Sequence, residues 1–344
     1  MHDKIKLAVW GVGRHARKHI LAAIEDAESP ELVGLCTRDQ TVGKEEADRN
    51  NCLYFSSSEE MLSDPRVDAV FLCTPTGLHF SQGQAVLQAG KHLWSEKTLT
   101  TSYAHSLQLV ELARDRNLFV GEAYMHKYHE QFRRLKETVE DKHLGRLMRL
   151  ICRFSIPVLD QPGFRAIPNL GASALLDVGS YTFSMADELL SGSPNFDFAE
   201  HQMGANGIDR SGICVLGYEG GSKAVLDWSY DSCYVNQIEL WFERGTVFTD
   251  KIFSKADDYK PVLQIRSLNG TIETEELPAE NCYVNMLNHF AYCSTHPTAN
   301  DFKTILSTSQ LISTFAEKVG MPEIGWQSTT INNIAPETHL YATG

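Results

Sequence analysis

Residues 5–16 read IKLAVWGVGRHA, and this stretch decides the fold of the first part of the chain. An apolar run over 5–11 leads straight into a Gly-Val-Gly turn, and apolar residues at three- and four-residue spacing predict a helix over 14–27. The first glycine permits the tight turn, the second lets a pyrophosphate approach the backbone, and the small Ala16 lets helix and strand pack closely. Free N–H groups at the start of the helix attract anions. The residues predicted to hold a dinucleotide here are Gly11, Val12, Gly13, Arg14 and His15.

The alternation of strand and helix continues to about residue 123. Further strands are predicted over 32–36, 68–74, 91–95 and 118–122, and further helices over 57–63, 79–89 and 101–116. Alternation of this kind is typical of a parallel sheet with crossover helices. We therefore predict a dinucleotide-binding domain over 1–123, built as a doubly wound parallel α/β sheet.

After residue 124 the pattern changes. Helices are predicted near 129–142, 172–191, 281–294 and 302–319, and a long strand over 146–156. Successive strands are predicted over 198–204, 212–218, 223–230, 236–242, 245–250 and 262–268. Short turns containing Gly or Asn-Gly separate several of these strands, which favours antiparallel pairing. The sequence predicts an α+β domain over 124–320 with a large, mainly antiparallel open sheet. The polar residues 321–344 are expected to form a tail or a docking arm.

Composition limits the classes of partner. The net charge of −13 over 344 residues repels nucleic-acid phosphates and anionic membranes, so neither is predicted to bind. The eight cysteines form no CxxC pair and lie in apolar stretches, as reduced core thiols do. No apolar run approaches membrane-spanning length. We expect a cytoplasmic protein.

The end of the second predicted strand indicates which dinucleotide binds. A site specific for NAD places Asp or Glu there, where the carboxylate binds the ribose 2′-hydroxyl. Here Thr37 and Arg38 follow the strand, and a carboxylate comes only at Asp39. A hydroxyl and a guanidinium suit a 2′-phosphate. We predict NADP as the cofactor, with NAD as the alternative if the strand extends far enough for Asp39 to reach the ribose.

Three side chains are candidates for proton transfer. Lys97 follows the apolar strand 91–95, either as an ordinary solvated loop lysine or as a proton donor beside a cofactor. Asp177 and Tyr181 stand four residues apart in the predicted helix 172–191, so they share one face. A carboxylate and a phenol on one face can grip a substrate hydroxyl and relay a proton to it. The same spacing is also common for a solvated residue beside a half-buried one.

Five segments, in this order and spacing, resemble the glucose-fructose oxidoreductase/inositol dehydrogenase (Gfo/Idh/MocA) family. They are GVGRHA (11–16), CTPTGLH (73–79), SEK (95–97), GEAYM (121–125) and GASALLDVGSY (171–181). The resemblance implies an N-terminal Rossmann domain and a C-terminal α/β domain, whose open sheet forms homodimers or homotetramers.

The resemblance also assigns roles to residues. Lys97 is implied to be the general acid or base, in contact with the nicotinamide ribose and the substrate, and Asp177 to orient the substrate hydroxyl. Tyr181, where many members carry histidine, would share the proton relay with Lys97, as in a tyrosine-containing subgroup. Further implied cofactor contacts are Thr74, Pro75, Thr76, His79, Glu96, Ala123 and Arg165, the last of which could instead form a loop salt bridge. Thr98 replaces the proline that usually follows the lysine.

Two functions follow as hypotheses. The first is an NADP(H)-dependent oxidoreductase that transfers hydride to or from a secondary alcohol or ketone of a sugar, sugar nucleotide or related polyol. The second is a non-catalytic dinucleotide-binding sensor or regulator on the same fold. Retention of Lys97, Asp177 and Tyr181 favours the enzyme, because a sensor needs no proton relay. No metal site is predicted, since this chemistry requires none.

Overall fold

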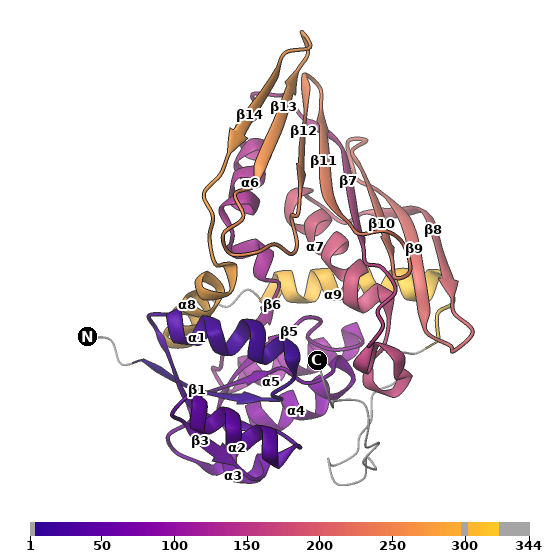
Figure 1. Cartoon of the computed structure of the whole chain (residues 1–344). Coiled ribbons are helices and arrows are strands. Elements are labelled where there is room, and N and C mark those ends of the chain that lie inside the picture. The colour runs from indigo at the N-terminus through magenta and orange to yellow at the C-terminus, as the bar shows by residue number, and fades with distance from the viewer. Residues whose placement is uncertain (1–3, 297–301, 323–344) are drawn as a thin grey trace.

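The first sheet is parallel and has the strand order β3-β2-β1-β4-β5-β6 in the computed structural model, which describes residues 4–296 and 302–322 (Figure 1). Its strands are β1 (Ile5–Trp10), β2 (Pro30–Cys36), β3 (Leu53–Phe55), β4 (Ala69–Leu72), β5 (His92–Glu96) and β6 (Val120–Ala123). The order reverses between β1 and β4, and ligands of such sheets bind at this switch point, beyond the carboxyl ends of the strands. The predicted doubly wound parallel sheet is confirmed.

Helical segments connect these strands. They are η1 (Ala16–Leu21, a π-helix), α1 (Ala22–Asp26), α2 (Gln40–Arg49), α3 (Ser58–Ser63), α4 (Thr76–Gln88) and α5 (Tyr103–Asp115). The sequence did not predict α2 or β3. α2 reads QTVGKEEADR and presents few apolar side chains, so its periodicity is weak, and β3 is only three residues long.

The second sheet has eight strands in the order β14-β13-β12-β11-β7-β10-β9-β8. They are β7 (Leu147–Ser155), β8 (Asn195–Met203), β9 (Asp209–Gly217), β10 (Lys223–Ser229), β11 (Val235–Phe242), β12 (Gly245–Asp250), β13 (Val262–Ser267) and β14 (Ile272–Glu276). All neighbours pair antiparallel except β7 and β10, which pair parallel. The mainly antiparallel sheet is confirmed, with β14 as an additional edge strand.

Helices cover one face of this sheet. The segments that follow β6 are η2 (Met125–Tyr128), α6 (Glu130–Asp141), η3 (Gly163–Ala166), η4 (Pro168–Leu170), η5 (Leu175–Gly179, a π-helix), α7 (Ser180–Leu189), α8 (Cys282–Thr295) and α9 (Phe302–Lys318). Figure 1 places α6 and α7 behind the sheet, with α9 between them and the first domain. Residues of β9 and β10 alternate between buried and half-buried, as expected when only one face is covered.

The chain returns to the first domain at α8. Asn288 accepts hydrogen bonds from the backbone N–H groups of Glu28 and Ser29, at 2.9 and 3.0 Å. Trp94 of β5 donates to Ser294 at 3.1 Å and packs edge-on against Phe290. A helix more than 150 residues away in sequence thus fixes the strand that leads to Lys97.

Three further observations concern the whole described chain. Within residues 4–296 and 302–322, no helix is both long and apolar enough to cross a membrane. Five of the eight cysteines are buried. The predicted tail or arm (321–344) lies, from residue 323 onward, outside the described residues.

Candidate active site

The glycine turn after β1 has the form that a dinucleotide phosphate requires. Gly11 has φ +99°, and a Cβ there would come within 2.9 Å of Cys73 and Thr74, so this glycine lets the turn pack on the end of β4. Gly13 is different, because its φ is not positive and a Cβ there would meet nothing within 4 Å. Neither strain nor packing against the protein explains the missing side chain. Open space before a helix start fits an approaching pyrophosphate.

The end of β2 fits a 2′-phosphate better than a free ribose. The strand ends at Cys36, and Asp39 accepts hydrogen bonds from two backbone N–H groups of α2, at 3.0 and 3.1 Å. This carboxylate is therefore committed to capping the helix. Arg38 is exposed and forms no ion pair with any described residue, and the same holds for Arg14 beside the glycine turn. Two unpaired guanidinium groups are available for anionic groups of a cofactor.

Lys97 is not a solvated loop lysine. It follows β5 directly, and its side chain is only 9% exposed. The ammonium group donates to the backbone oxygen of Asp177 at 2.5 Å and to its carboxylate Oδ1 at 2.9 Å. The peptide bond between Lys97 and Thr98 is cis. The structure thus brings Lys97 and Asp177, 80 residues apart in sequence, into direct contact.

Asp177 holds together a cluster of four side chains. Its Oδ2 accepts from Arg165 Nε at 2.5 Å and from the Tyr230 hydroxyl at 2.9 Å. Burial would raise the pKa of Asp177, but Arg165 and Lys97 outweigh it and hold the pKa well below its usual range. The carboxylate is ionised and fully engaged, so here it positions Lys97 and Arg165. The resemblance implied that Arg165 contacts the cofactor, with a loop salt bridge as the alternative. In the structure Arg165 forms a salt bridge, with Asp177.

Tyr181 meets Lys97 through its ring. The Lys97 ammonium lies 4.8 Å from the ring centroid, a cation–π distance. The phenol hydroxyl instead points to the Met125 sulfur at 3.5 Å. Burial raises the pKa of Tyr181 well above its usual value, so the hydroxyl keeps its proton. Lys97 and Tyr181 are therefore neighbours, as predicted. They meet through the ring of Tyr181, however, and not through the hydrogen bond between hydroxyl and ammonium that a direct proton relay would use.

The segment that carries Asp177 and Tyr181 starts with a π-helical turn. Buried Asp209 accepts from the Leu175 N–H at 2.7 Å and caps the start of this turn. A Cβ on Gly179 would come within 2.9 Å of the Trp228 ring, so this glycine lets the indole of β10 pack against the helix. The sequence predicted an ordinary helix over 172–191, without the π-helical turn. π-turns occur frequently at functional sites.

His79 lies behind the cofactor loop and not along it. Its side chain is buried, with Nδ1 2.9 Å from the Thr98 oxygen and Nε2 2.8 Å from the Thr74 oxygen. Burial lowers the pKa of His79, so the neutral ring donates to only one of the two carbonyl groups. His79 therefore connects the loop after β4 to the loop after β5.

The Thr74-Pro75-Thr76 loop touches the segment that carries Arg165. A Cβ on Gly77 would lie 2.7 Å from the Leu170 carbonyl carbon, and one on Gly171 would lie 2.7 Å from the Gly77 nitrogen. The two backbones are thus in direct contact, and only glycine fits on either side. This contact fixes the distance between the predicted cofactor loop and the Arg165 segment.

His15 and Glu96 form an ion pair across the glycine turn, with Nε2 and Oε1 3.0 Å apart. Burial works against both charges, yet their attraction dominates, so the pKa of His15 is raised and that of Glu96 lowered. The Tyr283 ring of α8 packs beside His15. Ala123 ends β6 and is buried. The glycine turn, the end of β5 and α8 therefore meet at the carboxyl ends of the strands of the first sheet.

Two residues of the site were not predicted. Tyr230 follows β10, and nothing in its local sequence, DWSYDS, marks it as a partner of Asp177. Glu122 lies in the GEAYM segment, yet only the neighbouring alanine was singled out. The Glu122 carboxylate Oε1 accepts a hydrogen bond from the Leu99 N–H at 2.7 Å, and Leu99 lies two residues beyond Lys97.

Two family models match the chain, one in each part. The model of the oxidoreductase family with an NAD-binding Rossmann fold (GFO_IDH_MocA) matches residues 5–124. The model of the GFO/IDH/MocA C-terminal domain matches residues 132–248.

Individual relatives cover most of the chain. A dTDP-3,4-didehydro-2,6-dideoxy-alpha-D-glucose 3-reductase from Saccharopolyspora spinosa is 30% identical over 292 residues, 85% of this chain and 88% of that protein. D-xylose 1-dehydrogenase (NADP(+)) 2 from Haloferax volcanii is 26% identical, over 80% of this chain and 84% of that protein. The structure of a 3-ketoreductase from Actinomadura kijaniata, solved with NADP and TDP-benzene, is also similar. Its TM-score is 0.87 at 25% identity, and the match covers 92% of this chain and 97% of that chain.

Proposed function

The chain belongs to the Gfo/Idh/MocA family of oxidoreductases, and from this membership we propose that it uses NADPH to reduce the ketone of a nucleotide-linked sugar, with Lys97 as proton donor. The observation that carries the proposal is the buried Lys97 ammonium, held by Asp177 above the Tyr181 ring. It stands at the carboxyl end of β5, one strand from the switch point. A solvated or structural lysine would not need this enclosure.

The proposed substrate class follows from the relatives. Four of them, at 24 to 30% identity, carry the same name of a dTDP-linked didehydro-dideoxyglucose 3-reductase. The 3-ketoreductase structures that contain NADP and TDP-benzene include variants with one lysine or one tyrosine replaced. Those two residues are separated in their own chain by the same number of residues as Lys97 and Tyr181 here. This correspondence supports a reductase of the same class.

The roles of the side chains follow from their contacts. When bound, NADPH supplies the hydride that reduces the carbonyl carbon. Lys97 donates a proton to the oxygen that becomes the hydroxyl group. Asp177 directs that ammonium group, and Arg165 helps to keep Asp177 ionised. Among the residues that the structure describes, the Tyr181 hydroxyl has only a thioether as acceptor, which is weak, so the hydroxyl can turn to the substrate oxygen at small cost and complete the relay.

The alternative function is a dinucleotide sensor without catalysis. The two functions are distinguished by following NADPH oxidation with dTDP-linked 3-keto sugars and free keto sugars, and NADP⁺ reduction with xylose, with cofactor binding measured separately by fluorescence. A reductase oxidises NADPH with at least one nucleotide-linked sugar, and Lys97→Ala slows the reaction by about 10²-fold or more. Tight NADPH binding without turnover of any sugar, unchanged in the variant, would support the sensor.

Replacing Arg38 with alanine is expected to weaken NADPH binding and leave NADH binding unchanged. Loss of charge-assisted hydrogen bonds to a 2′-phosphate corresponds to about 1.5–3 kcal/mol, or roughly 10- to 100-fold in Kd. Titration of both cofactors against the wild type and against Lys44→Ala, an exposed cation on α2, provides the measurement. Equal effects on NADPH and NADH would show that Arg38 does not contact the 2′-phosphate.

We also propose that the uncovered face of the second sheet joins copies of this chain. Ile151, Val225 and Val215 are in register on β7, β10 and β9 and are only half-buried, so they form an apolar row on this face. Val225→Asp is expected to shift the protein from dimer or tetramer to monomer, because a charge would be buried in the interface. Light scattering after size exclusion measures this, with Leu53→Asp on the first domain as control. An unchanged mass for Val225→Asp would exclude this face.

A further inference from the structure

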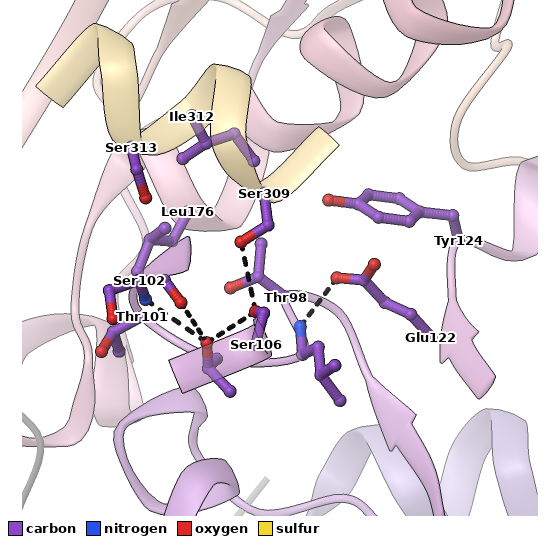
Figure 2. A pocket seen from close by; sticks show the side chains of 12 residues that line it. Thr98, Thr101, Ser102, Ser106, Glu122, Tyr124, Leu176, Ser309, Ile312 and Ser313 are labelled. Carbon is purple, nitrogen blue, oxygen red and sulfur yellow. Dashed lines mark hydrogen bonds between the residues drawn. The ribbon is translucent and has the colours of Figure 1, made fainter. Parts of the chain in front are cut away.

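A small cavity lies behind the loop that carries Lys97 (Figure 2). Its volume of about 10 Å³ has room for about one water molecule. Five segments line it: residues 98–102, α5, the end of β6 with Tyr124, η5, and α9, whose Ser309 and Ile312 face it. The hydroxyl groups of Thr100, Ser106 and Ser309 are already joined to one another by hydrogen bonds. The polar wall suits a bound water molecule.

Three groups on this wall, Glu122 and the hydroxyl groups of Thr98 and Tyr124, have hydrogen-bonding capacity to spare. Glu122 of β6 lines the cavity and uses one carboxyl oxygen to accept the Leu99 N–H at 2.7 Å. The Thr98 hydroxyl is buried and has no partner among the described residues. An unpaired buried hydroxyl is destabilising by about 1–3 kcal/mol, so a water molecule shared with the carboxyl group would satisfy it.

The same loop is held from its other side. The Thr98 backbone oxygen faces His79 Nδ1 at 2.9 Å, while the next residue, Leu99, donates to Glu122. The two residues that follow Lys97 are therefore fixed by groups from α4 and from β6.

We propose that Glu122 is a positioning residue for Lys97, acting through the Leu99 amide and through a water molecule in the cavity that joins its carboxyl group to the Thr98 hydroxyl. The inference rests on the proposed role of Lys97 as proton donor. Glu122 does not touch the substrate, and its effect on the reaction passes through the loop 97–99.

The charge of Glu122 changes near neutral pH. Burial raises its pKa to about 7, although the Leu99 N–H and the cations Lys127 and Lys97 act in the opposite direction. The Tyr124 hydroxyl on the same wall stays neutral, since burial raises its pKa. A carboxylate accepts an amide hydrogen bond more strongly than a neutral carboxyl group does. The loop is therefore held more firmly above about pH 7.

The test compares Glu122→Ala and Glu122→Gln with Glu111→Gln, a matched change on the exposed side of α5. Glu122→Ala should lower kcat by about 10- to 100-fold, because a displaced catalytic group loses its alignment, while the Kd for NADPH is unchanged. Glu122→Gln keeps an acceptor for Leu99 and should retain most of kcat, but its kcat should lack the rise through about pH 7. In a Lys97→Ala background, Glu122→Ala should have no further effect.

Crystal structures of the wild type and Glu122→Ala separate this inference from the proposed function. We expect one water molecule between Glu122 and Thr98 in the wild type, and a Lys97 ammonium displaced from Asp177 in the variant. That result supports positioning even if no sugar is reduced, in which case the proposed function alone fails. A dry cavity, or Lys97 still on Asp177 in the variant, overturns the inference, as does an additive loss of kcat in the Lys97→Ala background.

Discussion

Replacing Lys97 with alanine is expected to lower kcat for reduction of a nucleotide-linked keto sugar by about 10²- to 10⁴-fold, the usual contribution of a positioned general acid. This corresponds to about 3–5.5 kcal/mol in the activation barrier. The structure gives the reason, because the Lys97 ammonium is the cation held between Asp177 and the Tyr181 ring. Stopped-flow NADPH oxidation under single-turnover conditions measures the effect on the chemical step. The Kd for NADPH should change by a smaller factor than kcat does.

Lys97→Arg is the informative control. Arginine keeps the positive charge and the ion pair with Asp177, but it does not release a proton in proteins. The arginine variant should fold as stably as the wild type and be nearly as inactive as the alanine variant. Tyr181→Phe should retain the ring beside the ammonium and lose less activity than either. Substantial activity in Lys97→Arg would mean that Lys97 provides only charge.

Replacing Asp177 with alanine is expected to cause the largest loss of stability. Its carboxylate lies between Lys97 and Arg165, and its side chain is only 12% exposed. Removing one partner of a buried ion pair leaves uncompensated charge and typically costs about 3–5 kcal/mol. Urea unfolding measured by circular dichroism gives the difference in the free energy of unfolding. Activity should fall as well, because Lys97 loses its acceptor.

The pH dependence of stability gives a second readout for Asp177. Its pKa is lowered in the folded protein, so its contribution is fully present above the ordinary carboxyl value of about 4 and is lost as pH falls below it. The stability difference between wild type and Asp177→Asn should therefore be largest near neutral pH and shrink in acid. The double variant Arg165→Met with Asp177→Leu removes both charges and should recover part of the loss. A constant difference across this pH range would contradict the ion-pair account.

The glycine turn and the strand pattern were sufficient to predict the first sheet, because strand–turn–helix geometry is a local property of residues 5–16. The second sheet followed from short turns between apolar strands. The polar helix α2, the three-residue β3 and the edge strand β14 were missed, since each buries little apolar surface. The packing of α8 under β5 depends on contacts across most of the chain, which no local pattern encodes.

The candidate site was predictable in part. The motifs identified Lys97, Asp177 and Tyr181, and the structure brings all three together. Their pairing was not predictable, because the helix starts with a π-turn and the Tyr181 hydroxyl points to Met125. Tyr230 reaches Asp177 from another strand, so only the tertiary fold places it there. His79 was expected along the cofactor, whereas its burial places it behind the loop.

The most direct test of the account is transfer of deuterium from NADPH labelled at the reactive C4 position to a dTDP-linked 3-keto sugar. The account predicts that the wild type produces the sugar alcohol with one deuterium on the former carbonyl carbon, detected by mass spectrometry. Lys97→Ala should bind the labelled cofactor and form almost none of this product. Bound cofactor with no labelled sugar from the wild type, or equal labelling by both proteins, would contradict it.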